Sequence, residues 1–169
     1  VLNNTPPVFA AYAACSDVHM TDPYPIPHSP LTLVSEWTDV SRNAAGPTKP
    51  TWMCLQTQSL ALYGVPDGRW PSADELHCMM YLALTHGAKG IAWWCFSHAR
   101  EGGQWAAYES LYHDIGELAP YLLSADKVPG LSIVADNPQI HVSIHPRGNR
   151  CLILAANPGD RLDTRLTLS

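Results

Sequence analysis

Two kinds of hydrophobic pattern alternate along the first part of the chain. Thr51–Gln56 and residues 90–96 are nearly unbroken apolar runs that follow turn residues. Such runs are typical of strands buried on both faces of a parallel sheet. Between them, apolar residues recur at the spacing of one helix face: Leu76, Met79, Met80, Ala83 and Leu84. That spacing predicts an amphipathic helix.

The same alternation continues on both sides of this region. Residues 9–15 are rich in alanine and predict the last turns of a helix, and residues 17–21 predict a short strand. Residues 31–42 carry a nearly helical apolar stripe, and a second clear helix is expected over residues 105–118, broken near Pro120. The alternating order of helices and strands predicts βα units and a parallel sheet.

Local signals define the ends of the central helix. Ser72 and Glu75 have the spacing of a capping box, in which a hydroxyl and a carboxylate each bond a free backbone amide. Gly87, directly after His86, predicts a stop at the carboxyl end of the helix. Residues 97–103 are expected to form a loop.

The pattern changes near residue 128, where short strand candidates replace the βα alternation. They lie at residues 131–134, 140–145, 151–156 and 163–169. Residues 146–150 have the composition of a hairpin turn between the second and third candidates. We therefore expect two parts: βα units over residues 1–127 and an antiparallel β segment over residues 128–169.

Composition and charge exclude several classes of protein. The 169 residues include 10 Lys and Arg against 15 Asp and Glu, which gives a formal net charge of −5. A general nucleic-acid binder needs a cationic surface, so no nucleic-acid partner is expected. Apolar residues make up 46% of the chain, enough for a packed core. No window approaches the roughly 18 consecutive apolar residues of a membrane span, so no membrane partner is expected.

Aromatic residues give the first indication of a ligand. The chain has six Trp and seven Tyr against two Phe, and rings with polar tips suit flat, hydroxylated ligands. The five cysteines are widely spaced without a CxxC pair, and the eight histidines show no HExxH pattern, so neither a metal nor a cofactor is expected. Residues 3–5 fit an N-glycosylation acceptor, a triplet that is common by chance.

Four motifs carry a resemblance to a known family. They are D-P-Y-P at residues 22–25, K-P-T-W at residues 49–52, W-P-S followed by E-L at residues 70–76, and H-G-A-K-G at residues 86–90. Together they resemble the last three units of clan-A-like (β/α)₈ glycoside hydrolases, in the broad group related to β-galactosidase-type barrels. The resemblance covers nearly all of residues 8–169. It is fairly specific for the architecture and weak for the substrate.

The resemblance implies an α/β fold made of the sixth, seventh and eighth βα units of a TIM-type barrel, followed by a small antiparallel β domain. Active sites of such barrels lie at the carboxyl ends of the strands. By this resemblance Asp22 is the catalytic candidate. The substrate-binding candidates are Tyr24, Gln56, Trp94 and His98. Each has a simpler reading: Asp22 caps a loop, Tyr24 and Gln56 hold loops, Trp94 belongs to the core, and His98 is solvated.

The catalytic machinery departs from the family pattern. A retaining glycosidase needs two carboxylates about 5 Å apart. The resemblance places the acid/base on the fourth strand, which this chain lacks, and the nucleophile at the end of the seventh strand. Gln56 occupies that second place, and an amide is no comparable nucleophile. Gln56 therefore puts a retaining mechanism in doubt, although its amide suits hydrogen bonds to sugar hydroxyls.

Three functions remain open at this stage. The first is a glycoside hydrolase-like protein whose partner is the amino-terminal half of the barrel, in the same or another chain, because three βα units cannot close a barrel of eight. The second is a non-catalytic carbohydrate-binding or scaffold barrel. The third is a stand-alone α/β domain that binds a small molecule, for which neither a P-loop nor a nucleophile elbow gives support.

Overall fold

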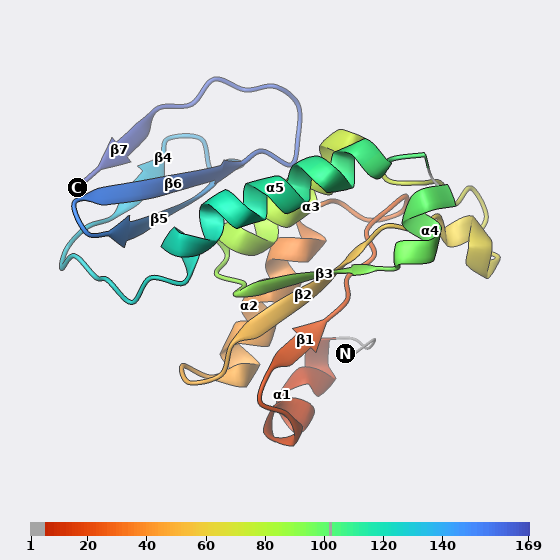
Figure 1. The fold of residues 1–169 in the computed structure, drawn as a ribbon, viewed down its shortest axis with the longest axis horizontal. Helices are drawn as coiled ribbons and strands as arrows, with labels where there is room; N and C mark the ends of the chain where they lie inside the picture. The colour runs from red at the N-terminus through yellow and green to blue at the C-terminus, as the bar shows by residue number, and fades with distance from the viewer. Residues whose placement is uncertain (1–5, 102) are drawn as a thin grey trace.

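A three-stranded parallel sheet forms the centre of the fold. The computed structural model describes residues 6–101 and 103–169, so the glycosylation triplet at residues 3–5 lies outside the described residues. The strands are β1 (His19–Thr21), β2 (Thr51–Gln56) and β3 (Gly90–Trp94), in the order β1-β2-β3 (Figure 1). Both neighbouring pairs are parallel, with Thr21 opposite Met53 and Gln56 opposite Trp94. The predicted βα arrangement and α/β class are confirmed.

Helices connect consecutive strands. Helix α2 joins β1 to β2, helix α3 joins β2 to β3, and helix α5 follows β3 (Figure 1). The described helices are η1 (Pro6–Val8), α1 (Phe9–Tyr12), η2 (Ala13–Cys15), α2 (Leu33–Ala45), η3 (Leu60–Tyr63), α3 (Ala73–Thr85), α4 (Phe96–Glu101) and α5 (Trp105–Leu122). The capping box is present at the start of α3, and Gly87 has a φ of +88° just beyond its end. No helix in the described ranges is long and apolar enough to cross a membrane.

Two local predictions are wrong. Residues 96–101 form the short helix α4, where the sequence predicted a loop over residues 97–103. Helix α5 continues through Pro120 and ends at Leu122, although a proline was expected to break it. Because Pro120 lies only two residues before the end of α5, its missing amide and ring disturb only the final turn.

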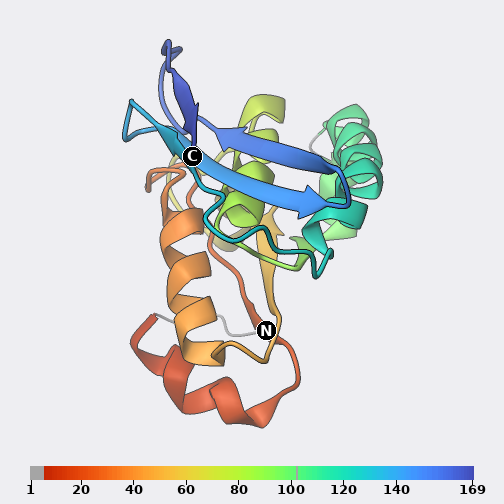
Figure 2. The same ribbon diagram turned by 90° about the vertical axis from the view of Figure 1, so that its left-hand side faces the viewer.

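The carboxyl-terminal segment consists of two small antiparallel sheets. Strand β4 (Ile133–Ala135) pairs with β7 (Leu166–Leu168), and β5 (His141–Arg147) pairs with β6 (Arg150–Ala156). Figure 2 shows the β5–β6 ribbon lying beside α3 and α5. The predicted antiparallel strands are confirmed at slightly shifted bounds, divided between two sheets.

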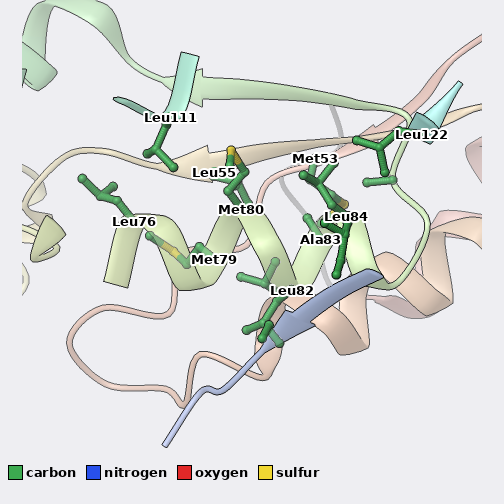
Figure 3. Packing of buried hydrophobic residues seen from close by; sticks show 14 residues of the cluster. Met53, Leu55, Leu76, Met79, Met80, Leu82, Ala83, Leu84, Leu111 and Leu122 are labelled. Carbon is green, nitrogen blue, oxygen red and sulfur yellow. The ribbon is translucent and has the colours of Figure 1, made fainter. Parts of the chain in front are cut away.

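One hydrophobic cluster joins the central sheet, the helices and the carboxyl-terminal strands. Figure 3 shows α3 supplying most of the side chains, which pack against β2 on one side and reach toward β6 on another. Met53 and Leu55 of β2, and Met79 and Met80 of α3, are completely buried. Leu154 of β6 belongs to the same cluster and is 2% exposed. The two predicted parts therefore share one core.

Among the described residues, the helices that pack on the central sheet lie on one face of it (Figure 1). Met53, Leu55 and Trp93 point into the helix layer, so the alternation of side chains turns Trp52 and Trp94 toward the opposite face. Those two rings are 40% and 47% exposed. The prediction of burial on both faces is confirmed for β2 except at Trp52, because Cys54 and Gln56 on the same face as Trp52 are 4% and 0% exposed. It is wrong for β3, which is half-buried along its length and exposed at Trp94. Within the described ranges β1 and β3 are edge strands, and the sheet does not close on itself.

Three side chains form a hydrogen-bonded chain between the helix layer and β5. Asp39 Oδ2 lies 2.9 Å from His86 Nδ1, and His86 Nε2 lies 2.7 Å from His141 Nδ1. The short contact between two imidazole nitrogens requires one to donate and the other to accept. If both rings are fully protonated, both nitrogens carry hydrogens and the contact becomes repulsive. The hydrogen bond between His86 and His141 therefore persists only while no more than one of the two rings is fully protonated.

We expect acid to weaken this hydrogen-bonded chain. Burial and the neighbouring His86 lower the pKa of His141, while Asp39 opposes the shift. Burial and then Lys89 lower the pKa of His145, also on β5. Between about pH 7.5 and pH 5.5 the unfolded chain thus binds more protons than the folded protein does. The free energy of unfolding should therefore fall as the pH drops across this range. Urea denaturation across that range tests this, and replacing His141 with Gln should make the profile less steep, with the contribution of His145 remaining. A wild-type profile that is already flat would contradict the expectation.

Candidate functional site

The carboxyl ends of the three parallel strands meet at one edge of the sheet. Asp22 directly follows β1, Gln56 ends β2 and Trp94 ends β3, with Gln56 and Trp94 opposite each other in the register. We call this end of the sheet the carboxyl edge. Parallel strands place their carboxyl ends together, so the sequence order alone brings these three predicted residues to one place.

Asp22 is a buried carboxylate with one unused oxygen. Its side chain is only 5% exposed. Oδ2 accepts a hydrogen bond from the Tyr24 hydroxyl at 2.9 Å. The other oxygen, Oδ1, is buried and finds no hydrogen-bond partner among the described residues. A polar oxygen without a partner is costly to bury, so a hydrogen-bond donor placed beside Oδ1 would stabilise it.

Burial is the main cause of the pKa shifts of Asp22 and Tyr24. It raises the pKa of Asp22 above its usual value, and the hydrogen bond from Tyr24 only partly opposes that shift. Burial, followed by the charge of Asp22, raises the pKa of Tyr24. Tyr24 therefore keeps its proton and acts as a donor. A carboxyl group with a raised pKa and a fixed donor beside it has the features of a group that can transfer a proton.

Gln56 has its amide fully engaged with the main chain. It is completely buried. Its Oε1 accepts from the Ile26 amide at 2.9 Å, and its Nε2 donates to the Ile26 carbonyl at 2.8 Å and to the Gln58 carbonyl at 3.1 Å. Gln56 thus clamps the loop that follows Asp22 onto the end of β2. In this arrangement the side chain positions the loop, and its binding of a ligand stays a prediction.

Trp94 presents an indole ring at the other side of the edge. The ring is about half exposed, and its Nε1 donates to the hydroxyl of Tyr63 at 3.3 Å. The Tyr63 ring, itself 55% exposed, packs edge-on against the imidazole of His98, with ring centroids 6.3 Å apart. His98 lies on helix α4, although it was predicted in a loop. These three rings form an aromatic cluster beside the carboxyl edge.

A thiol and two hydroxyls complete the surroundings of Trp94. The sulfur of Cys95 lies 3.5 Å from His98 Nδ1 and 3.2 Å from the Ser97 hydroxyl. The hydroxyl of Thr57 donates to the Trp94 carbonyl. The peptide bond between Trp94 and Cys95 is cis. Together these contacts fix the backbone at the point where the indole leaves the strand.

Sequence reasoning missed Tyr63 and Cys95 as members of this site. Tyr63 lies in a segment without hydrophobic periodicity, and only the 3₁₀ turn at Leu60–Tyr63 brings its hydroxyl to Trp94. Cys95 was counted only as one of five widely spaced cysteines without a CxxC pair. The sequence offered no signal for it, because residues 90–96 predicted a strand and residues 97–103 a loop, and neither indicated that Cys95 and His98 would lie together.

The site combines a buried carboxyl group with exposed aromatic rings. Asp22 offers a hydrogen-bond acceptor, and the hydroxyl of Tyr24 can both donate and accept. Trp94 and Tyr63 offer flat apolar faces. In the described part of the chain, no group of three or more His, Cys, Asp or Glu side chains is arranged to hold a metal ion. The arrangement suits a neutral ligand that has both hydroxyl groups and an apolar ring face.

Comparisons with known proteins identify no relative. No family model, no curated protein and no solved structure matches the chain.

Proposed function

We propose that the carboxyl edge forms part of a carbohydrate site, as in glycoside hydrolase-like barrels. In this proposal Asp22 contacts the reacting or bound sugar, and Trp94 and Tyr63 stack on its ring face. The observation that carries the proposal is the unpaired Oδ1 of Asp22, a buried acceptor for which a sugar hydroxyl is a fitting donor. The D-P-Y-P motif at residues 22–25 supports the same assignment.

We further propose that the central sheet is a segment of a (β/α)₈ barrel. Three features support this: the strands are parallel, they follow one another in sequence order, and the helices lie on one face. In a barrel the other face is the interior, where side chains of neighbouring strands pack together. The exposed Trp52 and the unpaired edges of β1 and β3 would then be covered by the remaining strands.

A non-catalytic carbohydrate-binding barrel is the second candidate, and Gln56 favours it. The family resemblance expects a nucleophilic carboxylate at this position. The amide that replaces it donates two hydrogen bonds to carbonyl oxygens, which a carboxylate could not do. Sugar binding without cleavage by the full protein would select this candidate over the hydrolase.

Removing the indole at the carboxyl edge should weaken sugar binding without unfolding the protein. Because Trp94 is half exposed, Trp94→Ala should change the free energy of unfolding by about 1 kcal/mol or less. Loss of its stacking face should raise the Kd for oligosaccharides about tenfold. Titration calorimetry with an oligosaccharide panel measures the Kd, and cleavage of aryl glycosides is assayed in parallel.

The matched control removes another exposed ring. Tyr112 on α5 is 80% exposed, and Tyr112→Ala should leave sugar affinity unchanged. Equal loss of affinity in both variants would contradict a specific role for Trp94. If the full protein neither binds nor cleaves any member of the panel, the carbohydrate proposal fails and a domain for another small molecule remains.

A further inference from the structure

A second cavity lies at the opposite end of the sheet from Asp22. It has a volume of about 640 Å³. Thr51, the first residue of β2, and Lys89, directly before β3, line it. Arg42, in the last turn of α2, and His86, at the end of α3, line it as well. The cavity is therefore built by the amino ends of two strands and the carboxyl ends of two helices.

Three strong bases line this cavity. Arg42, Lys49 and Lys89 line it together with the imidazoles of His86 and His145, and no Asp or Glu is among its lining residues. This is unexpected in a chain with 15 acidic and 10 basic residues. In the residues that the structure covers, none of the three strong bases forms an ion pair. Three strong bases thus line one cavity without an ion pair of their own in the described part of the chain, while the neighbouring carboxylate of Asp39 is bonded to His86.

Each of these cations uses only part of its hydrogen-bonding capacity. Lys49 Nζ donates to the Ala13 carbonyl at 2.6 Å, and Lys89 Nζ donates to the Leu122 carbonyl at 2.6 Å. Arg42 donates from one guanidinium nitrogen to the His86 carbonyl at 2.8 Å. An ammonium group has three donors and a guanidinium has five. Most of their donors therefore have no hydrogen-bond partner among the described residues.

Helix capping explains these single bonds but not the grouping of charges. A cation near a helix carboxyl end is favourable, and Arg42 serves the end of α3 in this way. Lys89 and Arg42, however, repel each other: burial and then the charge of Arg42 lower the pKa of Lys89. The hydroxyl of Thr51 is also buried in this wall without a hydrogen-bond partner among the described residues. Repelling cations and an unpaired hydroxyl are what an anion would satisfy.

We propose that this cavity binds a phosphate group, either as inorganic phosphate or as part of a small phosphate ester. A phosphate dianion matches several cations better than a carboxylate, because it carries up to two charges on three acceptor oxygens. Arg42 supplies a planar pair of donors for two of those oxygens, and Lys49 and Lys89 supply point charges. The site is separate from the carboxyl edge and does not depend on the carbohydrate proposal.

Titration calorimetry of the full protein with inorganic phosphate, at constant ionic strength, tests the site. We expect saturable binding of one phosphate per chain. Arg42→Gln should raise the Kd at least tenfold, because a charge-assisted pair of hydrogen bonds is lost. Arg161→Gln, which removes an exposed arginine outside the cavity, should leave the Kd unchanged. Tighter binding of glucose 6-phosphate than of inorganic phosphate would identify a phosphate ester as the preferred ligand.

Thermal denaturation provides a second readout. Phosphate should raise the melting temperature of the wild type and of Arg161→Gln, and should raise that of Arg42→Gln much less. If Arg42→Gln does not fold, Lys49→Gln takes its place, with the same expected loss. Absence of saturable phosphate binding, or a Kd unchanged by both substitutions, would overturn the proposal. Neither result bears on sugar binding at the opposite end of the sheet.

Discussion

Replacing Gln56 with Ala is expected to lower the free energy of unfolding by about 3 kcal/mol. The substitution removes all three hydrogen bonds of a completely buried amide. It leaves the amide and carbonyl of Ile26 without partners in the protein interior, where each unpaired group is costly. Urea denaturation monitored by tryptophan fluorescence measures the loss. A change below about 0.5 kcal/mol, typical of a surface site, would show that the clamp is not essential.

The variant Gln56→Glu tests the two hydrogen bonds that the Gln56 amide donates, because it keeps the shape of the side chain and removes its donor. A carboxylate keeps the shape and can still accept from the Ile26 amide, but it faces the carbonyls of Ile26 and Gln58 as a second acceptor. We therefore expect Gln56→Glu to destabilise the protein as well. If the clamp holds the loop after Asp22 in place, both variants should also weaken sugar binding. Undiminished stability in Gln56→Glu would contradict the assigned orientation of the amide.

Replacing Asp22 with Asn should impair function while sparing the fold. Asn keeps an oxygen for the Tyr24 hydroxyl and removes the charge. If the full protein cleaves glycosides, the rate should fall at least a hundredfold, because proton transfer by a positioned carboxyl group contributes about that much. If it only binds sugar, affinity should fall about tenfold. Steady-state assays and calorimetry distinguish these cases, and unchanged activity and affinity would remove Asp22 from the site.

The stability of the Asp22→Asn variant provides an independent check. A raised pKa means that the folded state binds the Asp22 proton more tightly than the unfolded state. Ionisation of Asp22 therefore costs stability as the pH rises through its folded pKa. Asn removes that cost, so the free energy of unfolding near pH 7 should stay level or rise by up to about 1 kcal/mol. Asp17→Asn, at an exposed position, is the matched control and should change neither function nor stability.

Periodicity predicted the elements of the fold well. The buried run at Thr51–Gln56 is a strand with the expected bounds, and the stripe from Leu76 to Leu84 faces the core as expected. The Ser72–Glu75 capping box is present because it depends on two side chains three residues apart. These features are local, so the sequence contains all the information they need.

Predictions that required long-range information were less accurate. Nothing along β2 and β3 indicated that helices would cover only one face of the sheet, because an apolar run does not specify what packs on it. The α4 helix was missed because it is too short to show an apolar period. At the site, the sequence brought Asp22, Gln56 and Trp94 to one edge through strand order. It could not reveal that the Gln56 amide is already bound to the Ile26 main chain.

Hydrogen exchange of the full protein with and without a saturating oligosaccharide tests the central claim most directly. The account predicts slower exchange at the carboxyl edge, in residues 22–27, 57–63 and 95–98, since the ligand rests on these segments. Exchange at the amino end of the sheet, in residues 42–50 and 85–89, should not change. Protection confined to that amino end, or no protection anywhere in the chain, would contradict a carbohydrate site at Asp22.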